Sequence, residues 1–142
     1  MIVVDDYPPN IDAISAVFPA ARRKGVLFTY GETVYAPGRT AISHALDAHE
    51  SVHSRRQGKT EQSINYWWGE YLSNVEFRFY EELLAHQAEY KWFNQHIKDR
   101  NQLAKALHTI AVRLSSDLYG SVINYSNARA AVMGNRYILK DT

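Results

Sequence analysis

The chain has 142 residues, of which 46% are hydrophobic and 22% are charged, as is ordinary for a single globular domain. Its formal net charge is +1, so no overall electrostatic field would draw in nucleic acid or an anionic membrane. The chain has no cysteine, which excludes disulfide bonds and thiolate metal sites. The composition therefore predicts no nucleic-acid partner and no membrane partner.

The beginning of the chain, MIVVDDYPPN, lacks the basic and apolar regions of a secretory signal. No apolar run approaches the roughly 20 residues that are needed to cross a membrane. We therefore expect the protein to be made and used in a cytoplasm, although a chain that is later built into a particle would look the same.

The first predicted elements are a short helix and a β-hairpin. Asn10 is placed to cap a helix through IDAISAVF that ends near Pro19. In KGVLFTYGETVYAPG, two β-rich runs at 26–30 and 33–36 flank Gly31, which favours a hairpin or a strand-turn-strand edge.

A helix over 41–57 is predicted next, with Thr40 as its cap and Gly58 as its end. The stretch that follows, KTEQSINYWWGEYLSN, is first polar and then aromatic. We expect it to be a loop with a helical turn.

The second half of the chain has helical periodicity. Over 75–97, apolar or ring-bearing residues recur every three or four positions, namely Phe79, Leu83, His86, Tyr90, Phe93 and Ile97. Asp99 or Asn101 is expected to start a further helix through LAKALHTIAVRL, and Ser126 to cap a last one after the break at SSDLYGS. The predicted class is α+β and predominantly helical, as one domain over 1–142.

The helix over 41–57 carries the pattern His-Glu-x-x-His as His49, Glu50 and His53. Residues four apart in a helix are offset by about 40° and 6 Å, so both imidazoles can reach one ion. Glu50 directly follows His49 and lies further round the helix, where its carboxylate can contact a water molecule on that ion. The alternative is that both histidines are surface or core-lining residues and that Glu50 is solvated.

A catalytic zinc site usually has three protein ligands and one open position for water, whose pKa falls to about 7. In the 75–97 helix, Glu82 lies about 60° from the centre of the apolar stripe, whereas Glu81 lies about 160° away and is expected to face water. Glu82 is thus the carboxylate best placed to point inward as a third ligand. The alternative is a residue at the boundary of an amphipathic helix.

The segments HESVHSRRQG, YWWGEYL and FRFYEELLAHQAEY resemble small zincin-type metallopeptidases of the gluzincin kind, found in phage and bacterial genomes. In that family a glutamate on a later helix, within a Glu-x-x-Ala signature, completes the site, and Glu82 fits this signature. The resemblance covers about residues 25–95. It implies a minimal zincin-like domain in which His49, His53 and Glu82 bind Zn²⁺ and Glu50 is the general base. It also implies an edge strand, FTYGETVYAPG, that binds peptide substrate in extended form.

This chain departs from the family at His86, where many relatives have an acidic residue that orients a histidine. His86 is therefore a rival ligand to Glu82. Tyr119, beside Gly120 at a break between helices, is a candidate stabiliser of the developing oxyanion, with a core tyrosine as the alternative.

The remaining polar and aromatic residues near the motif have predicted supporting roles. Gln57 extends the metal-binding face and is expected to hold its edge through a hydrogen bond. Trp67 and Trp68 are expected to pack against the motif helix. The other histidines are interpreted as surface or packing residues, namely His44, His96 and His108.

Two functions follow from these features. The first is a zinc-dependent peptidase acting on a peptide or protein substrate, in the host cytoplasm if the gene belongs to a phage. The second is a non-catalytic structural or adaptor protein, for instance a virion component that contacts other subunits of a phage particle and keeps the zincin fold. The small size favours the second, whereas Glu50 keeps catalysis possible, because a purely structural metal site needs no base.

Overall fold

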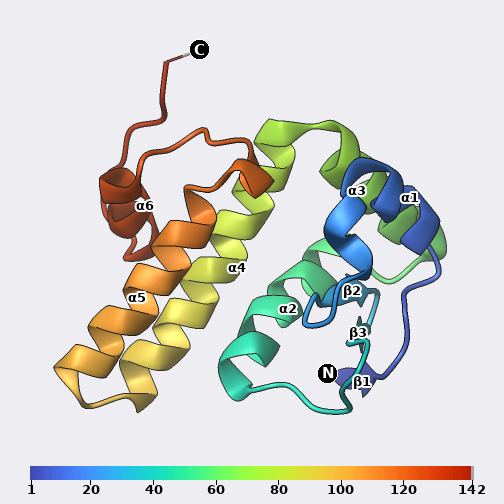
Figure 1. Ribbon diagram of the computed structural model, residues 1–142, viewed down its shortest axis with the longest axis horizontal. Coiled ribbons are helices and arrows are strands. Elements are labelled where there is room, and N and C mark those ends of the chain that lie inside the picture. The colour runs from blue at the N-terminus through green and yellow to red at the C-terminus, as the bar shows by residue number, and fades with distance from the viewer. Residues whose placement is uncertain (142) are drawn as a thin grey trace. The chain divides into compact units, whose positions relative to one another are not determined.

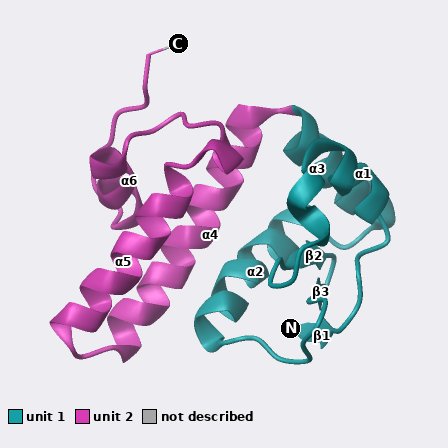
Figure 2. Ribbon diagram, in the orientation of Figure 1, with its two compact units in different colours: residues 1–73 teal, residues 74–142 magenta. Residues whose placement is uncertain are grey.

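The computed structural model describes residues 1–141 and has two compact units, residues 1–73 and 74–142 (Figures 1 and 2). Helices predominate, and a small sheet lies in the first unit, which confirms the predicted α+β class. The expectation of one zincin-like domain over 1–142 stays a prediction. Within the described residues, none of the helices has the length and apolar character that a membrane span requires.

The sheet of the first unit has three strands in the order β1-β3-β2. The predicted hairpin at Gly31 is confirmed as β2 (Phe28–Tyr30) and β3 (Thr33–Tyr35), which pair antiparallel with Thr29 opposite Val34. The unpredicted β1 (Ile2–Val4) pairs parallel to β3. The strand β1 was missed for two reasons. Its three residues are too few to show the alternating pattern of a strand. Its partner β3 lies about thirty residues further along the chain, so no local sequence pattern marks the pairing.

Two short helices follow β1. The helix α1 (Ile11–Val17) confirms the prediction, and the 3₁₀ helix η1 (Pro19–Arg22) comes directly after it. Asn10 precedes α1 as expected, but its side chain makes no capping hydrogen bond within the described chain.

The motif helix α2 (His44–Gln57) begins later than predicted. Its cap is Ser43, whose Oγ accepts a hydrogen bond from the Leu46 N–H at 3.2 Å, so the assignment to Thr40 was wrong. A side chain at the N-cap position bonds the N–H two or three residues on, and the chain enters its first helical turn only at His44. Gly58 ends α2 as predicted, with φ 81° and ψ −168°.

The aromatic stretch after Gly58 is the helix α3 (Glu61–Ser73), so the predicted loop was wrong. At its start Ser63 N–H donates to Thr60 Oγ1 at 3.0 Å, and Thr60 N–H donates to Ser63 Oγ at 3.3 Å. This is a reciprocal capping box with serine in the place of glutamate. Ile64, Trp67 and Trp68 form the buried face of the helix.

The second unit consists of α4 (Val75–His96), α5 (Arg100–Leu114), the 3₁₀ helix η2 (Asp117–Tyr119) and α6 (Tyr125–Val132) (Figure 1). The three α-helices pack on one another around an apolar core. Its buried members are Phe79, Leu83, Leu107, Ile110, Ala111, Leu114, Tyr119, Ile123, Ala128, Ala131 and Val132.

Two helix starts in the second unit test the predicted caps. Asp99 caps α5 as predicted, and its Oδ1 accepts from the backbone N–H of Asn101 and Gln102. Asn124, not Ser126, caps α6, with its Oδ1 accepting from the Asn127 N–H at 2.9 Å.

The long helix α4 buries charged side chains as well as its apolar stripe. Glu81 is 1% exposed, so the expectation that it faces water was wrong. The helix α4 buries more than one face, so the angular distance of a residue from the apolar stripe does not predict its exposure. The other buried charged or polar residues of α4 are Arg78, Glu82, His86 and Glu89.

Replacing Gly58 by alanine is expected to lower the free energy of unfolding by about 1–3 kcal/mol, because only glycine readily adopts this φ and ψ. An added Cβ would also lie 2.7 Å from Ser63 Oγ. Gly69→Ala is the matched control, because nothing lies within 4 Å of its added Cβ, and in a helix alanine should stabilise by about 0.5–1 kcal/mol. Urea unfolding measures both, and equal effects would contradict this account of the helix end.

Candidate metal centre

The His-Glu-x-x-His motif forms a buried polar cluster on α2. His49, Glu50 and His53 are 7%, 6% and 5% exposed, and each offers a ligand atom within 4.8 Å of the others. The two imidazole rings have centroids 5.0 Å apart. Nitrogen and oxygen donors at this spacing are a donor set that suits zinc. The helical spacing thus brings together the three residues that the sequence singled out.

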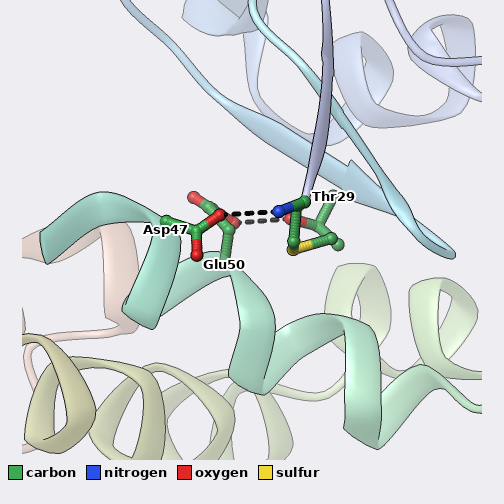
Figure 3. A network of polar contacts seen from close by, with 4 residues as sticks. Thr29, Asp47 and Glu50 are labelled. Atoms are coloured by element: carbon green, nitrogen blue, oxygen red, sulfur yellow. Dashed lines mark hydrogen bonds and ion pairs between the residues drawn. The ribbon is translucent and has the colours of Figure 1, made fainter. Parts of the chain in front are cut away.

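Glu50 has a partner that the sequence analysis missed. The Thr29 hydroxyl donates a hydrogen bond to Glu50 Oε2 at 2.7 Å, and Thr29 is 3% exposed (Figure 3). The sequence carries a hint of this bond. Thr29 is a polar residue in the middle of the short strand FTY, and a polar side chain that is buried needs a hydrogen-bond partner.

Asp47, one turn before Glu50, has a different environment (Figure 3). Its Oδ1 accepts from the amino group of Met1 at 3.0 Å, and its side chain is 41% exposed. The two carboxylates of α2 therefore differ in kind, because only that of Glu50 is buried beside the histidines.

Gln57 ties the end of α2 to the edge strand β2 through hydrogen bonds, and its predicted place at the edge of a metal-binding face stays a prediction. Its Oε1 accepts from the Gly31 N–H at 2.7 Å, and its Nε2 donates to the Thr29 carbonyl at 2.8 Å. Trp68 Nε1 donates to the same carbonyl at 3.1 Å. Because these two backbone groups are already bonded within the protein, an extended peptide cannot pair with them.

Aromatic rings of α3 pack against the motif. The centroid of the Trp67 ring lies 5.3 Å from that of His53, and Tyr71 stacks on Trp67 at 4.9 Å. The prediction that Trp67 packs against the motif helix is confirmed. This contact restricts the orientation of the His53 ring.

The other predicted ligands lie on α4. Glu82 is 4% exposed, and it belongs to the second unit whereas His49 and His53 belong to the first. Its role as the third ligand stays a prediction. His86 Nδ1 lies 3.2 Å from Glu89 Oε1, with both side chains buried. A carboxylate commonly orients a metal-binding histidine in this way, so His86 remains the rival ligand to Glu82.

Tyr119 lies in the apolar core of the second unit and is 7% exposed. Its ring centroid is 6.1 Å from that of His86. The structure thus gives Tyr119 a packing role, and its predicted role at a developing oxyanion stays a prediction. The remaining histidines are exposed as predicted, namely His44, His96 and His108.

Comparison of the chain with protein-family models, curated proteins and solved structures finds no match.

Gln57→Leu is expected to lower the free energy of unfolding by about 1–3 kcal/mol, because the buried Gly31 N–H and Thr29 carbonyl each lose a partner. Gln57→Glu should also destabilise, since glutamate can accept from Gly31 but cannot donate to Thr29 when ionised. Gln62→Leu, at an exposed position of α3, is the control and should change stability by at most about 0.5 kcal/mol. Urea titration followed by tryptophan fluorescence measures all three. A Gln57→Leu protein as stable as the control would show that the two bonds contribute nothing.

Proposed function

We propose that this protein is a zinc-dependent peptidase that hydrolyses amide bonds in a peptide or protein substrate. The observation that carries the proposal is the buried cluster of His49, Glu50 and His53 on one face of α2. Two imidazole nitrogens and a carboxylate form a donor set whose chemistry suits a divalent cation.

His49 and His53 are the ligands that the first unit supplies. Two histidines leave zinc short of the three protein ligands usual in catalytic sites. Glu82 of α4 is the proposed third ligand, and His86 is the alternative. When bound, zinc polarises the carbonyl oxygen of the scissile amide and lowers the pKa of a water molecule.

Glu50 is the proposed general base. Its carboxylate accepts a proton from the water that attacks the carbonyl carbon, and it then delivers a proton to the leaving nitrogen as the C–N bond breaks. The products are a carboxylic acid and an amine, so every proton is accounted for. Oε2 of Glu50 accepts the bond from Thr29, and Oε1 is the oxygen that serves in proton transfer.

The strand expected to bind substrate is β2, at the edge of the sheet and in contact with α2. The Thr29 carbonyl and the Gly31 N–H are bonded to side chains of the protein itself. We therefore propose that the substrate is held mainly by groups other than these two.

Isothermal titration of the metal-free protein should show a single zinc-binding event that His49→Ala and His53→Ala each weaken. The loss should exceed the roughly 10–100-fold that removal of an outer-shell partner causes. His44→Ala is the matched control, because His44 is an exposed histidine of the same helix. Equal losses in this control and in the motif variants would show that binding is not at the motif.

The third ligand is tested by the same titration on Glu82→Ala and His86→Ala. We expect the larger loss of zinc affinity in Glu82→Ala. Glu76→Ala, an exposed glutamate of α4, is the control and should bind zinc as the wild type does. A larger loss in His86→Ala would make His86 the ligand, and full affinity in both variants would exclude both residues as ligands.

Glu50→Gln should keep zinc and lose about 10²–10⁴-fold in the rate of peptide cleavage, because it removes only the base. Cleavage of an internally quenched peptide library by the zinc-loaded protein measures this. Asp47→Asn, one turn earlier on α2, is the control and should retain the rate. A zinc-loaded wild type that cuts no peptide would instead support a non-catalytic structural or adaptor protein, such as a phage virion component, that keeps the metal.

A further inference from the structure

Thr29, the middle residue of β2, forms three hydrogen bonds with helices of the first unit. Its hydroxyl donates to Glu50 Oε2 at 2.7 Å. Its carbonyl accepts from Gln57 Nε2 at 2.8 Å and from Trp68 Nε1 at 3.1 Å. Side chain and backbone of one strand residue are thus bonded to both α2 and α3.

These contacts hold the Thr29 hydroxyl in one place. The backbone is fixed by pairing with β3, where Thr29 lies opposite Val34, and by the two bonds to its carbonyl. The side chain is 3% exposed and β-branched, so its χ1 rotation is restricted. A hydroxyl held in this way is a fixed donor, and an ionised carboxylate can only accept from it.

Glu50 without this donor would have a rotatable side chain whose buried carboxylate must find other partners. A hydrogen bond to Oε2 selects one orientation of the carboxylate and keeps Oε1 for proton transfer. Outer-shell partners that orient metal ligands contribute about 10–100-fold to metal affinity or activity, and we expect a donor that orients the general base to act on a similar scale.

We infer that Thr29 is a positioning residue for Glu50, acting through its hydroxyl and not by contact with substrate or metal. This inference rests on the proposed peptidase function. It adds a residue from the edge strand to a site whose other members lie on helices.

Thr29→Val tests the inference, because valine keeps the shape and the backbone bonds and removes only the donor. The zinc-loaded variant should keep zinc affinity and KM for a cleaved peptide and lose about 10–100-fold in kcat. Thr29→Ser keeps the hydroxyl and should restore most of the rate. Thr33→Val, the same change on the neighbouring strand β3, is the matched control and should leave the rate unchanged. If the valine variant does not fold, Thr29→Ala, which also removes the hydroxyl, replaces it in these measurements.

A second measurement does not depend on turnover. Acetohydroxamate chelates zinc, and its hydroxyl needs an acceptor beside the ion, a role that suits the Glu50 carboxylate. Glu50→Gln and Thr29→Val should each weaken its binding to the zinc-loaded protein by about tenfold or more. Combining the two changes should add little, because both act through one carboxylate. A purely structural effect of Thr29 would add in full to that of Glu50→Gln.

The outcomes separate the inference from the proposed function. If Glu50→Gln abolishes cleavage and weakens acetohydroxamate binding while Thr29→Val does neither, Thr29 is not a positioning residue and the peptidase proposal stands. If the wild-type protein binds zinc and acetohydroxamate but cuts no peptide, the peptidase proposal fails, and the acetohydroxamate series still decides whether Thr29 orients Glu50. If the wild type binds no zinc, both are overturned.

Discussion

The desolvation of the Glu50 carboxylate is the constraint on which the first unit depends. A buried carboxylate beside two imidazoles needs a donor of its own, because an isolated charge in a low-dielectric interior is strongly disfavoured. The hydroxyl of Thr29 is that donor. To supply it, the hairpin must lie against α2 at one register, and the bonds from Gln57 and Trp68 to the same residue hold it there.

Both units bury polar side chains beside apolar ones. The core of the second unit is built largely from leucine, isoleucine, alanine and valine on α4, α5 and α6. Around α2, the buried residues include histidine, glutamate, glutamine and tryptophan, and hydrogen bonds and ring contacts add to the packing of apolar residues such as Val52 and Ile64. Side chains that are held by directional contacts keep one orientation, which a site for proton transfer and metal binding requires.

The features that the sequence predicted well are those with local causes. The hairpin follows from Gly31 between two β-rich runs, and the common face of His49 and His53 follows from helical spacing alone. The α3 helix was missed because its serine capping box and aromatic face do not match the usual patterns, although Thr60 and Ser63 carry a signal. Glu81 was misplaced because α4 buries more than one face. The partner of Thr29 could not be named because its bond joins a strand to a helix 21 residues further along the chain.

The carboxamide of Gln57 bonds the edge of β2 as the backbone of a neighbouring strand would, accepting from one residue and donating to the residue two before it. An unprotected strand edge is a template on which a second chain can add its own strand, and it is a common origin of aggregation. With its side-chain amide in that position, the protein closes this part of its sheet to intermolecular growth. The same glutamine that ends the motif helix therefore also occupies the backbone groups through which a second chain would add a strand at this point.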